Sequence, residues 1–455
     1  LDEKTALLDT ADASVGAQFL ENVAAALDGR KLDYLIVDHM EPDHTAMIEA
    51  VLVRWPDLRP VVNAKTLPML KMYFPTDSAA IDDALVVKEG DTLDLGKHKL
   101  TFVMAPMVHW PEVMMTFDTT TGTLFSADAF GTFGALEGAL FADEVDFAGK
   151  WLDDARRYYA NIVGKYGVQV QAVLKKAATL PIETIAPLHG PVWRKNLGWF
   201  IGKYDLWSRC EPEEKAVVVL YGSMYGNTAS AANALAAKVA AKGVKVAVHD
   251  LSCIDNSEAV AECWRASTIV LAAPTYNGGI YLPAANLLED LKALNLHDRT
   301  FALVENGSWA PMSAKLMAAY LDFQFVDAAD WVKFRMDGSV DQETSYACLR
   351  RQVVGRGLVT PGFYGLMPDG QIHTFSRGGS DITGSLAAAA LNAKVYENWT
   401  DVSGILMADP RIVDNPQAIP EVTYDELREL SYSGAQVLHE GAIFPVREKN
   451  IPLNI

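Results

Sequence analysis

A short polar segment that directly follows an apolar run limits what the first half of this chain can fold into. The run is Tyr34-Leu35-Ile36-Val37, and the segment reads His39-Met40-Glu41-Pro42-Asp43-His44. Because the run is β-branched and apolar, and Pro42 cannot donate to a strand ladder, we predict a buried strand that ends in a loop. Four metal-capable side chains in six residues indicate a metal site. From this spacing alone, an acidic polar loop without metal is equally good.

Three later strands end in the same way. We predict these strands over residues 100–104, 123–126 and 184–187. Each is followed by a histidine or an aspartate, in the order His109, Asp128 and His189. Any one of these alone is more often a loop or core residue than a ligand. Together with the segment 39–44 they would bring four histidines and three carboxylates to one sheet edge, enough for two metal ions with a bridging carboxylate.

The order and spacing of these residues, together with Phe125-Ser-Ala-Asp-Ala-Phe-Gly-Thr-Phe-Gly134, closely resemble the flavodiiron proteins. The N-terminal domain of that family has the metallo-β-lactamase-like αββα fold. The resemblance implies that His39, Glu41 and His109 bind one iron, that Asp43, His44 and His189 bind the other, and that Asp128 bridges them. The first strands of the family, ahead of the strand that we predict over residues 5–10, are expected to be missing here.

Glu41 separates iron from zinc chemistry. Zinc hydrolases of the metallo-β-lactamase fold have a histidine at this position, and a hard carboxylate favours iron over zinc. A zinc hydrolase therefore remains an alternative that this residue disfavours.

A second region, residues 213–312, follows a polar linker at 210–215. An apolar strand over 216–221 leads into a small, hydroxyl-rich loop and a helix over 229–242, which is a cradle for a phosphate group. Strands over 268–273 and 301–304 lead into two further glycine-containing loops. The residues predicted to bind the cofactor are Ser223, Met224, Tyr225, Gly226, Asn227, Thr228, Pro274, Thr275, Tyr276, Asn277, Gly278, Gly279, Asn306, Gly307, Ser308 and Trp309.

These three strand ends are typical of a flavodoxin-like doubly wound parallel sheet that binds FMN at its carboxyl edge. Tyr276 or Trp309 would flank the flavin ring. An α/β domain with ordinary glycine turns is the alternative. The region also resembles the second domain of the flavodiiron family.

The third region, residues 313–455, resembles the C-terminal half of the aspartate kinase catalytic domain, of the amino-acid kinase fold. Four blocks carry the resemblance: 376–381, 396–404, 408–411 and 431–439. ATP and Mg²⁺ would be bound by Arg377, Gly378, Gly379, Ser380, Asp381, Thr400, Asp401, Asp409 and Arg411. Since the Lys-x-Gly-Gly segment of that family is absent, we expect this partial amino-acid-kinase-like α/β segment to be inactive or nearly so.

The junction near Ser313–Met317 fits both families, and we interpret the chain as a chimeric fusion of two incomplete genes. Residues 323–326 and 342–351 have the right type and order to act as the last strand and helix of the flavodoxin-like sheet.

Charge and cysteine content restrict partners and location. The net charge of −19, from 39 basic and 58 acidic residues, argues against nucleic acid or an anionic membrane as a partner. No apolar run approaches the roughly 20 residues of a membrane span. The four cysteines form no C-x-x-C pair, which fits a reducing compartment. We expect a cytoplasmic protein.

The sequence thus predicts a flavodiiron oxidoreductase with domains at 1–212, 213–312 and 313–455. It would reduce O₂ to water and/or NO to N₂O at two irons fed by FMN. The resemblance implies rubredoxin or a flavin reductase as electron donor, and a head-to-tail homodimer or dimer of dimers. The alternatives are an aspartate kinase fragment and a zinc hydrolase.

Overall fold

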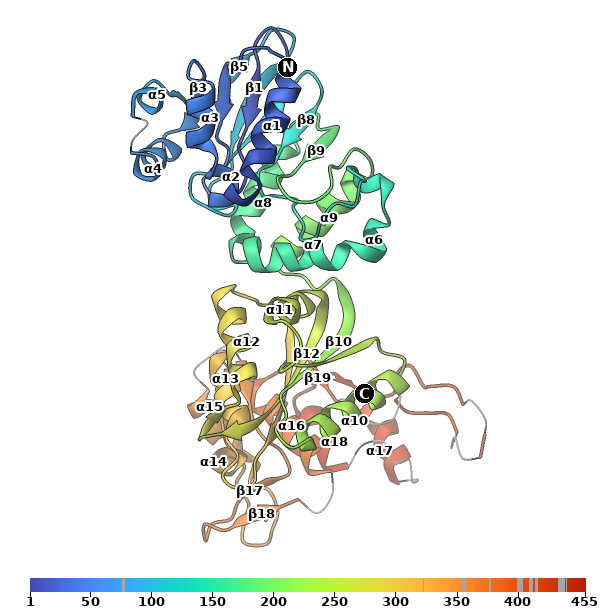
Figure 1. The fold of residues 1–455 in the computed structure, drawn as a ribbon. Coiled ribbons are helices and arrows are strands. Elements are labelled where there is room, and N and C mark those ends of the chain that lie inside the picture. The colour runs from blue at the N-terminus through green and yellow to red at the C-terminus, as the bar shows by residue number, and fades with distance from the viewer. Residues whose placement is uncertain are drawn as a thin grey trace. The chain divides into compact units, whose positions relative to one another are not determined.

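The structure, a computed structural model, describes residues 1–75, 78–321, 323–353, 357–375, 378–398, 404–408, 412–413, 416–432, 438 and 440–455 (Figure 1). It forms two compact units. The first consists of Leu1–Ala240, Val244–Ala272 and Leu282–Val304, and the second of Ala241–Gly243, Ala273–Tyr281 and Glu305–Ile455. These two units do not coincide with the three domains predicted from the sequence, at 1–212, 213–312 and 313–455, which stay predictions.

Two sheets form the N-terminal part of the first unit. One is parallel, in the order β1-β2-β3-β4. The other has the order β5-β6-β7-β8-β9 and is antiparallel except for the parallel pair β8 and β9. The strands are β1 (Ala6–Leu8), β2 (Tyr34–Ile36), β3 (Arg59–Asn63), β4 (Leu85–Val87), β5 (Thr92–Asp94), β6 (Lys99–Met104), β7 (Met114–Asp118), β8 (Thr123–Phe125) and β9 (Thr184–Ala186).

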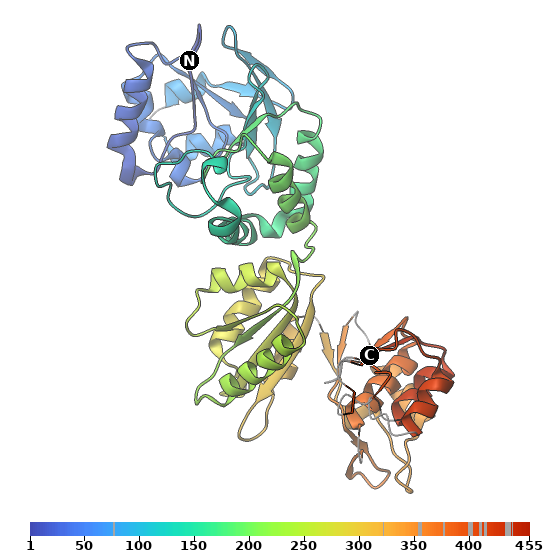
Figure 2. The same cartoon turned by 90° about the vertical axis from the view of Figure 1, so that its right-hand side faces the viewer.

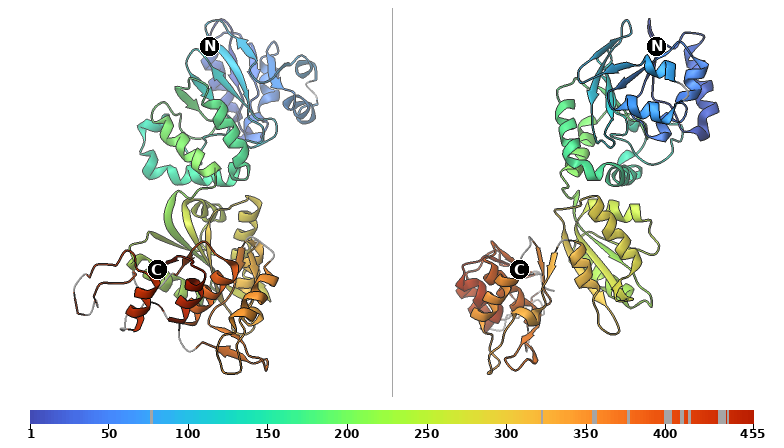
Figure 3. Two further views of the ribbon diagram at one scale, coloured as in Figure 1. Left: turned by 180° about the vertical axis from the view of Figure 1, so that it is seen from behind. Right: turned by 90° about the vertical axis from the view of Figure 1, so that its left-hand side faces the viewer.

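Helices lie outside both sheets, so the layers run helix, sheet, sheet, helix. In the right panel of Figure 3 the blue helices, which include α1, lie on one side and the green helices on the other. The helical elements are η1 (Ala13–Val15), α1 (Gly16–Leu27), α2 (Pro42–Thr45), α3 (Ile48–Arg54), α4 (Thr66–Tyr73), α5 (Ser78–Asp82), η2 (Ala142–Glu144), α6 (Phe147–Lys150), α7 (Leu152–Tyr158), η3 (Tyr159–Val163), η4 (Gly164–Tyr166), α8 (Gly167–Ala177) and α9 (Leu197–Ser208).

The N-terminal part has two buried apolar clusters, one on each face of the parallel sheet. Leu35 and Val37 belong to the buried cluster shared with helices α1, α3 and α4. Ile36 and Val61 belong instead to the cluster shared with the second sheet. Because successive side chains of a strand point to opposite faces, one apolar run serves both layers.

A second sheet system completes the first unit. Strand β10 (Glu214–Tyr221) pairs in parallel with β11 (Val246–Asp250) and with β12 (Ala266–Tyr276), and β14 (Thr300–Asn306) pairs with β12. Helix α10 (Asn227–Ala241) packs against one face through Ala232 and Ala236. The remaining helices are α11 (Asn256–Arg265) and α12 (Leu282–Ala293). Figure 2 shows helices on both sides of these strands, which confirms the doubly wound sheet.

The second unit has its own buried core, in which Trp331, Leu349, Leu386 and Ala442 are almost fully buried. Its strands are β13 (Gly279–Ile280), β15 (Phe323–Phe325), β16 (Gly357–Val359), β17 (Tyr364–Leu366), β18 (Ile372–Thr374), β19 (Tyr396–Glu397) and β20 (Leu453–Asn454). Its helices are α13 (Ser313–Tyr320), α14 (Ala328–Trp331), α15 (Gln342–Gln352), α16 (Gly379–Leu391), α17 (Tyr424–Tyr432) and α18 (Glu440–Glu448).

One expectation about this unit is wrong. Residues 323–326 do not extend the flavodoxin-like sheet, because β15 pairs in parallel with β16 in a separate two-stranded sheet. The predicted helix at 342–351 does form, as α15, but it packs against α16 in the core of the second unit. Val326 of the first segment and Tyr346 and Leu349 of the second belong to the C-terminal core.

None of the helices in the described part of the chain has the length and apolar character that crossing a membrane requires.

Candidate metal centre

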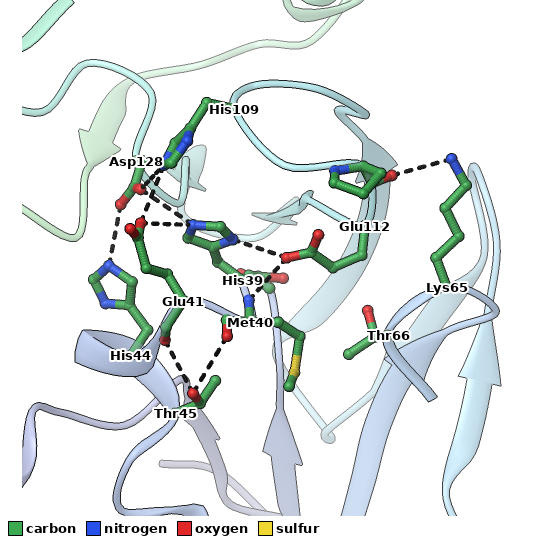
Figure 4. Close-up of polar contacts among 12 residues, drawn as sticks. His39, Met40, Glu41, His44, Thr45, Lys65, Thr66, His109, Glu112 and Asp128 are labelled. Carbon is green, nitrogen blue, oxygen red and sulfur yellow. Dashed lines mark hydrogen bonds and ion pairs between the residues drawn. The ribbon is translucent and has the colours of Figure 1, made fainter. Parts of the chain in front are cut away.

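The seven predicted ligands come together at one end of the two N-terminal sheets. His39 and Glu41 follow β2, Asp43 and His44 belong to the short helix α2, and His109 lies between β6 and β7. Asp128 follows β8, and His189 follows β9. The seven form two clusters that could each hold an ion: His39, Glu41, His109 and Asp128 in one, and Asp43, His44 and His189 in the other. Figure 4 shows the first cluster and the contact of Asp128 with His44.

The predicted loop at 39–44 is in part a helix. Helix α2 begins at Pro42, which has no backbone N–H and so fits the first helical position, and Glu41 is its extended N-cap. This turn places Asp43 and His44 beside the second cluster. The expectation of a loop through residue 44 is therefore wrong for its last residues.

In the first cluster, Nε2 of two histidines faces the same two carboxylate oxygens. His39 Nε2 lies 3.3 Å from Glu41 Oε2 and 3.3 Å from Asp128 Oδ2. His109 Nε2 lies 3.1 Å from Glu41 Oε2 and 3.0 Å from Asp128 Oδ2. Four donor atoms thus surround one point.

Asp128 turns its other oxygen to the second cluster. Its Oδ1 lies 3.2 Å from His44 Nε2 and 3.5 Å from His189 Nε2. Asp43 Oδ2 lies 3.4 Å from the same atom of His44 and 3.2 Å from that of His189. One carboxylate therefore faces both clusters with one oxygen each, which is the arrangement of a bridging ligand.

The chain around Asp128 is held in an unusual conformation. Ala127 and Phe130 have positive φ angles of 49° and 67°, although neither is glycine. The N–H of Phe130 donates to the hydroxyl of buried Tyr204 at 2.7 Å, and the N–H of Leu188 donates to the Ala127 carbonyl at 2.9 Å. Because strained backbone persists only where its surroundings determine it, these contacts fix Asp128 relative to the loop of His189.

The donor set fits two metal ions. Ligands bound to one ion at about 2.1 Å lie roughly 3.0–3.4 Å apart, which matches the separations within both clusters. Asp43 Oδ1 and Asp128 Oδ1 are buried without a hydrogen bond of acceptable geometry. Buried oxygens of this kind are expected where a cation supplies the missing partner.

The histidines and carboxylates of the two clusters shift one another's pKa values. Burial lowers the pKa of His39, but contacts with Asp128, Glu112 and Glu41 outweigh burial and raise it to about 12. His109, followed by His39, lowers the pKa of Glu41 to about 2. The pKa of Asp128 is lowered as well, since three histidines outweigh its burial. Because ligands must be deprotonated, a bound cation would displace these protons.

Sequence reasoning missed three buried carboxylates around the centre. Glu112 contacts the outward nitrogen of His39, and Asp9 accepts from the backbone N–H groups of Asp38 and His39 at 2.9 and 3.3 Å. Burial raises the pKa of Asp9 and of Asp38. These three residues follow a strand or lie in a loop, where acidic residues are common. Their role near the centre is therefore visible only from their neighbours in the folded structure.

The first predicted flavin loop lies between β10 and α10. The Ser223 hydroxyl accepts from the N–H of Gly226 at 3.1 Å, and Gly226 has a positive φ of 85°. Thr228 is buried in the first turn of α10, whereas Met224 and Tyr225 are exposed. The loop therefore leads into the start of a 15-residue helix, which is the position that the predicted phosphate cradle requires.

The other two predicted flavin loops belong to the second unit. Asn277 and Gly278, with positive φ angles, form the turn of the hairpin between β12 and β13. The Thr275 hydroxyl accepts from the N–H groups of Met312 and Ser313 and caps α13. The indole of Trp309 is 84% exposed, so its ring face is available to a ligand.

Of the kinase-like residues, Gly378, Gly379, Ser380 and Asp381 are described. Gly378 has a positive φ of 62° and caps the 13-residue helix α16, in whose first turn Asp381 lies. The other predicted residues, Arg377, Thr400, Asp401, Asp409 and Arg411, lie outside the described residues.

Two family models match this chain. Residues 1–190 match the ODP family beta lactamase, and residues 207–455 match the amino acid kinase family. The second match includes β10 to β14 as well as the segment after residue 313.

Named relatives match this chain over a stretch that includes parts of both ranges. "Nitric oxide reductase" of Moorella thermoacetica is 33% identical over 320 residues, which cover 70% of this chain and 78% of the relative. "Anaerobic nitric oxide reductase flavorubredoxin" of Vibrio vulnificus is 31% identical, with coverage of 75% and 69%. Because 320 residues exceed the length of segment 1–190, this likeness continues into the part that matches the amino acid kinase model.

Solved structures agree with this. The rubredoxin oxygen:oxidoreductase of Desulfovibrio gigas is 28% identical, with a TM-score of 0.66 and coverage of 71% of this chain and 80% of that chain. The flavodiiron protein of Giardia intestinalis, 24% identical with a TM-score of 0.67 and coverage of 86% and 85%, shares the fold. The chain therefore belongs to the flavodiiron protein family, and its C-terminal part belongs to the amino acid kinase family.

Proposed function

We propose that this protein reduces nitric oxide, dioxygen or both at a pair of irons held by the seven clustered residues. The observation that carries the proposal is the position of Asp128, whose two oxygens face two separate groups of ligands. The names of the relatives, a nitric oxide reductase and an oxygen oxidoreductase, support both substrates.

His39, Glu41 and His109 would hold one iron, Asp43, His44 and His189 the other, and Asp128 would bridge. Bound there, two ferrous ions would supply the site for a diatomic molecule and two electrons. The chain contributes the surroundings. The ring of Tyr158 lies 5.6 Å from that of His189 and is buried, so it shields this side of the centre from water. Burial, followed by the charge of Asp128, raises the pKa of Tyr158, so its phenol stays protonated.

Glu41 favours this redox function over zinc hydrolysis. Its Oε2 faces both histidines of the first cluster, so a hard, anionic donor occupies a position that a neutral imidazole would fill in a zinc hydrolase. Three carboxylates around two divalent ions leave a small net charge, which suits a neutral diatomic substrate.

FMN bound by the flavodoxin-like part of the chain would deliver electrons. Reduction of O₂ to two waters consumes four electrons and four protons, and conversion of two NO to N₂O and water consumes two of each. Two ferrous ions and a reduced flavin together store four. Rubredoxin or a flavin reductase would reduce the flavin, and a head-to-tail homodimer or dimer of dimers would bring the flavin of one chain to the irons of another.

The match to the amino acid kinase model supports a second candidate, ATP and Mg²⁺ binding at Gly378–Asp381 and the neighbouring predicted residues. The start of α16 would bind phosphate oxygens through backbone N–H groups. Phosphorylation of aspartate is expected to be weak or absent without the transferring lysine. Binding of ATP with Mg²⁺ and phosphorylation of aspartate are measured separately.

Consumption of NO and of O₂ by the full chain tests the main proposal. The protein is loaded anaerobically with Fe²⁺ and FMN, reduced chemically, and supplied with either gas at an electrode. We expect consumption that is lost in Asp128→Asn and retained in His98→Asn, because His98 pairs with Asp118 outside the two clusters. Equal rates in wild type and Asp128→Asn would contradict the proposal.

A further inference from the structure

Glu112 is a buried carboxylate that has no place among the seven ligands. It lies in the loop between β6 and β7, three residues after His109, and its side chain is fully buried. Burial of a carboxylate is unfavourable unless the group is hydrogen-bonded or paired. Its Oε1 accepts from the Met40 N–H at 2.9 Å and lies 2.9 Å from Nδ1 of His39 (Figure 4).

This contact determines which nitrogen of His39 carries the proton. Oε1 already accepts from a backbone N–H, so it faces Nδ1 as an acceptor, and Nδ1 must be the donor. The lone pair of the neutral ring is then on Nε2, the atom that faces Glu41 and Asp128. That tautomer is the one a metal ligand needs.

The loop that carries Glu112 is itself anchored. Asn63, at the end of β3, donates its side-chain N–H to the Glu112 carbonyl at 2.5 Å. The amide oxygen of Asn63 accepts from the N–H groups of Lys65 and Thr66, and Lys65 Nζ donates to the Pro111 carbonyl at 3.2 Å. Glu112 is therefore fixed from its backbone as well as from its side chain.

The two clusters differ in this respect. Among the described residues, no hydrogen bond from Nδ1 of His44, His109 or His189 to a protein group is present. Of the four histidines, His39 is the one whose Nδ1 contacts a carboxylate in the described part of the chain, whereas the charge of Asp9 acts on His44 without a hydrogen bond. His39 belongs to the cluster of Glu41 and His109. A carboxylate in this position makes the imidazole a stronger electron donor, which stabilises the more highly charged state of a bound metal.

We propose that Glu112 is a positioning residue that fixes the tautomer of His39 and makes the two metal positions unequal. The ion of the His39, Glu41 and His109 cluster is bound more tightly and has the lower reduction potential of the two. The inference rests on the proposed function in one respect, the use of the seven residues as metal ligands. It concerns metal binding and not the reduction of NO or O₂.

Metal titration of the full chain tests this inference. The metal-free protein is titrated anaerobically with Fe²⁺ against a chelator, in wild type and in Glu112→Gln, which keeps the shape and the acceptor oxygen but removes the charge. We expect two binding steps, of which one is weakened about 10- to 100-fold in the variant while the other is unchanged. In a redox titration, one of the two iron steps moves to higher potential. Glu213→Gln, a buried carboxylate paired with Arg156 and Lys203, is the matched control and changes neither step.

Equal weakening of both steps, or no change in either, would overturn the inference. If Glu112→Gln does not fold, a measurement on the wild type still tests the inference. In protein loaded with diamagnetic Zn²⁺ and labelled with ¹⁵N-histidine, NMR should show a protected Nδ1–H of His39. A proton on Nε2, or no protected imidazole proton, would also overturn it. Failure of NO and O₂ consumption with two unequal metal steps would refute the proposed function and leave this inference standing.

Discussion

Nε2 of His44 lies 3.1 Å from Nε2 of His189, although the two residues are 145 positions apart in the chain. Burial lowers the pKa of both side chains. Contacts with Asp128 outweigh burial for His44 and raise its pKa, whereas the pKa of His189 stays lowered. The two imidazoles therefore differ in basicity although their Nε2 atoms face each other. A divalent ion bound between these atoms would accept a lone pair from each ring.

Removal of metal should consequently destabilise the protein. We expect a chelator to lower the melting temperature and Fe²⁺ to restore it. At a free ion concentration a hundred times the dissociation constant, the gain is about 3 kcal/mol per ion. Differential scanning calorimetry of the full chain measures this, with His98→Asn as a variant that should respond like the wild type. An identical melting temperature with and without the chelator would contradict the metal centre.

Glu41 is expected to set the preference for iron. Glu41→His replaces a hard anionic donor that contacts two histidines by a neutral imidazole. The ratio of bound iron to bound zinc should fall on the order of tenfold, which corresponds to about 1.4 kcal/mol. Elemental analysis after anaerobic incubation with equal amounts of Fe²⁺ and Zn²⁺ gives the ratio. The exposed Glu137→His adds a histidine elsewhere and should leave it unchanged; an unchanged ratio in Glu41→His would show that this residue does not select the metal.

Gly190 should be needed for the second cluster. Its φ is 82°, and an added Cβ would lie 2.2 Å from Cγ2 of Thr132. Gly190→Ala therefore strains the backbone next to His189 by about 1–3 kcal/mol and displaces that ligand. We expect weaker binding of one of two ions in a chelator competition. Gly202→Ala is the control: Gly202 lies inside α9 with open space around its Cβ position, so the variant should be slightly more stable and bind both ions. Normal binding by Gly190→Ala would show that the loop tolerates the side chain.

Glu262 should make stability depend on acid. Burial raises its pKa, but Arg265 and His249 outweigh burial and lower the pKa to about 2 from an ordinary 4.5. A lowered carboxyl pKa stabilises the folded state above pH 4.5, and this contribution is lost as pH falls from 4.5 towards 2. Glu262→Gln should be less stable by on the order of 1–3 kcal/mol at pH 6 and should approach the wild type at pH 2 to 3. Urea unfolding at both pH values measures the difference.

Glu258→Gln serves as the control for that comparison, since Glu258 is exposed on the same helix, α11. We expect the same stability difference from wild type at pH 6 and pH 3. A difference for Glu262→Gln that does not shrink on acidification would mean that its effect is not electrostatic.

The clustering of the seven predicted ligands could be anticipated from the sequence because most of them follow a recognisable strand. The β-branched runs before His39, Asp128 and His189 all form strands. The expectation of a single sheet edge is wrong, because β2 belongs to one sheet and β8 and β9 to the other, but the two sheets end side by side, so the polar residues that follow these strands meet. In the same way, the apolar run at 216–221 predicted a strand, and the loop that follows it lies between β10 and α10.

Features that depend on tertiary neighbours could not be read in this way. The contact of Glu112 with Nδ1 of His39 joins residues 73 positions apart and has no local pattern. Likewise, the apolar pattern at 323–326 predicts a strand but not its partner, and β15 pairs with β16 instead of the larger sheet.

The electron count in a single turnover tests the central claim most directly. The full chain, loaded with iron and FMN and fully reduced, is mixed anaerobically with excess NO and no further reductant, and N₂O is measured. Four stored electrons should convert four NO into about two N₂O per chain, and a preparation without FMN should yield about one. If the iron-loaded, reduced protein forms no N₂O and also leaves O₂ unconsumed, the two ligand clusters do not form the reductase that we propose.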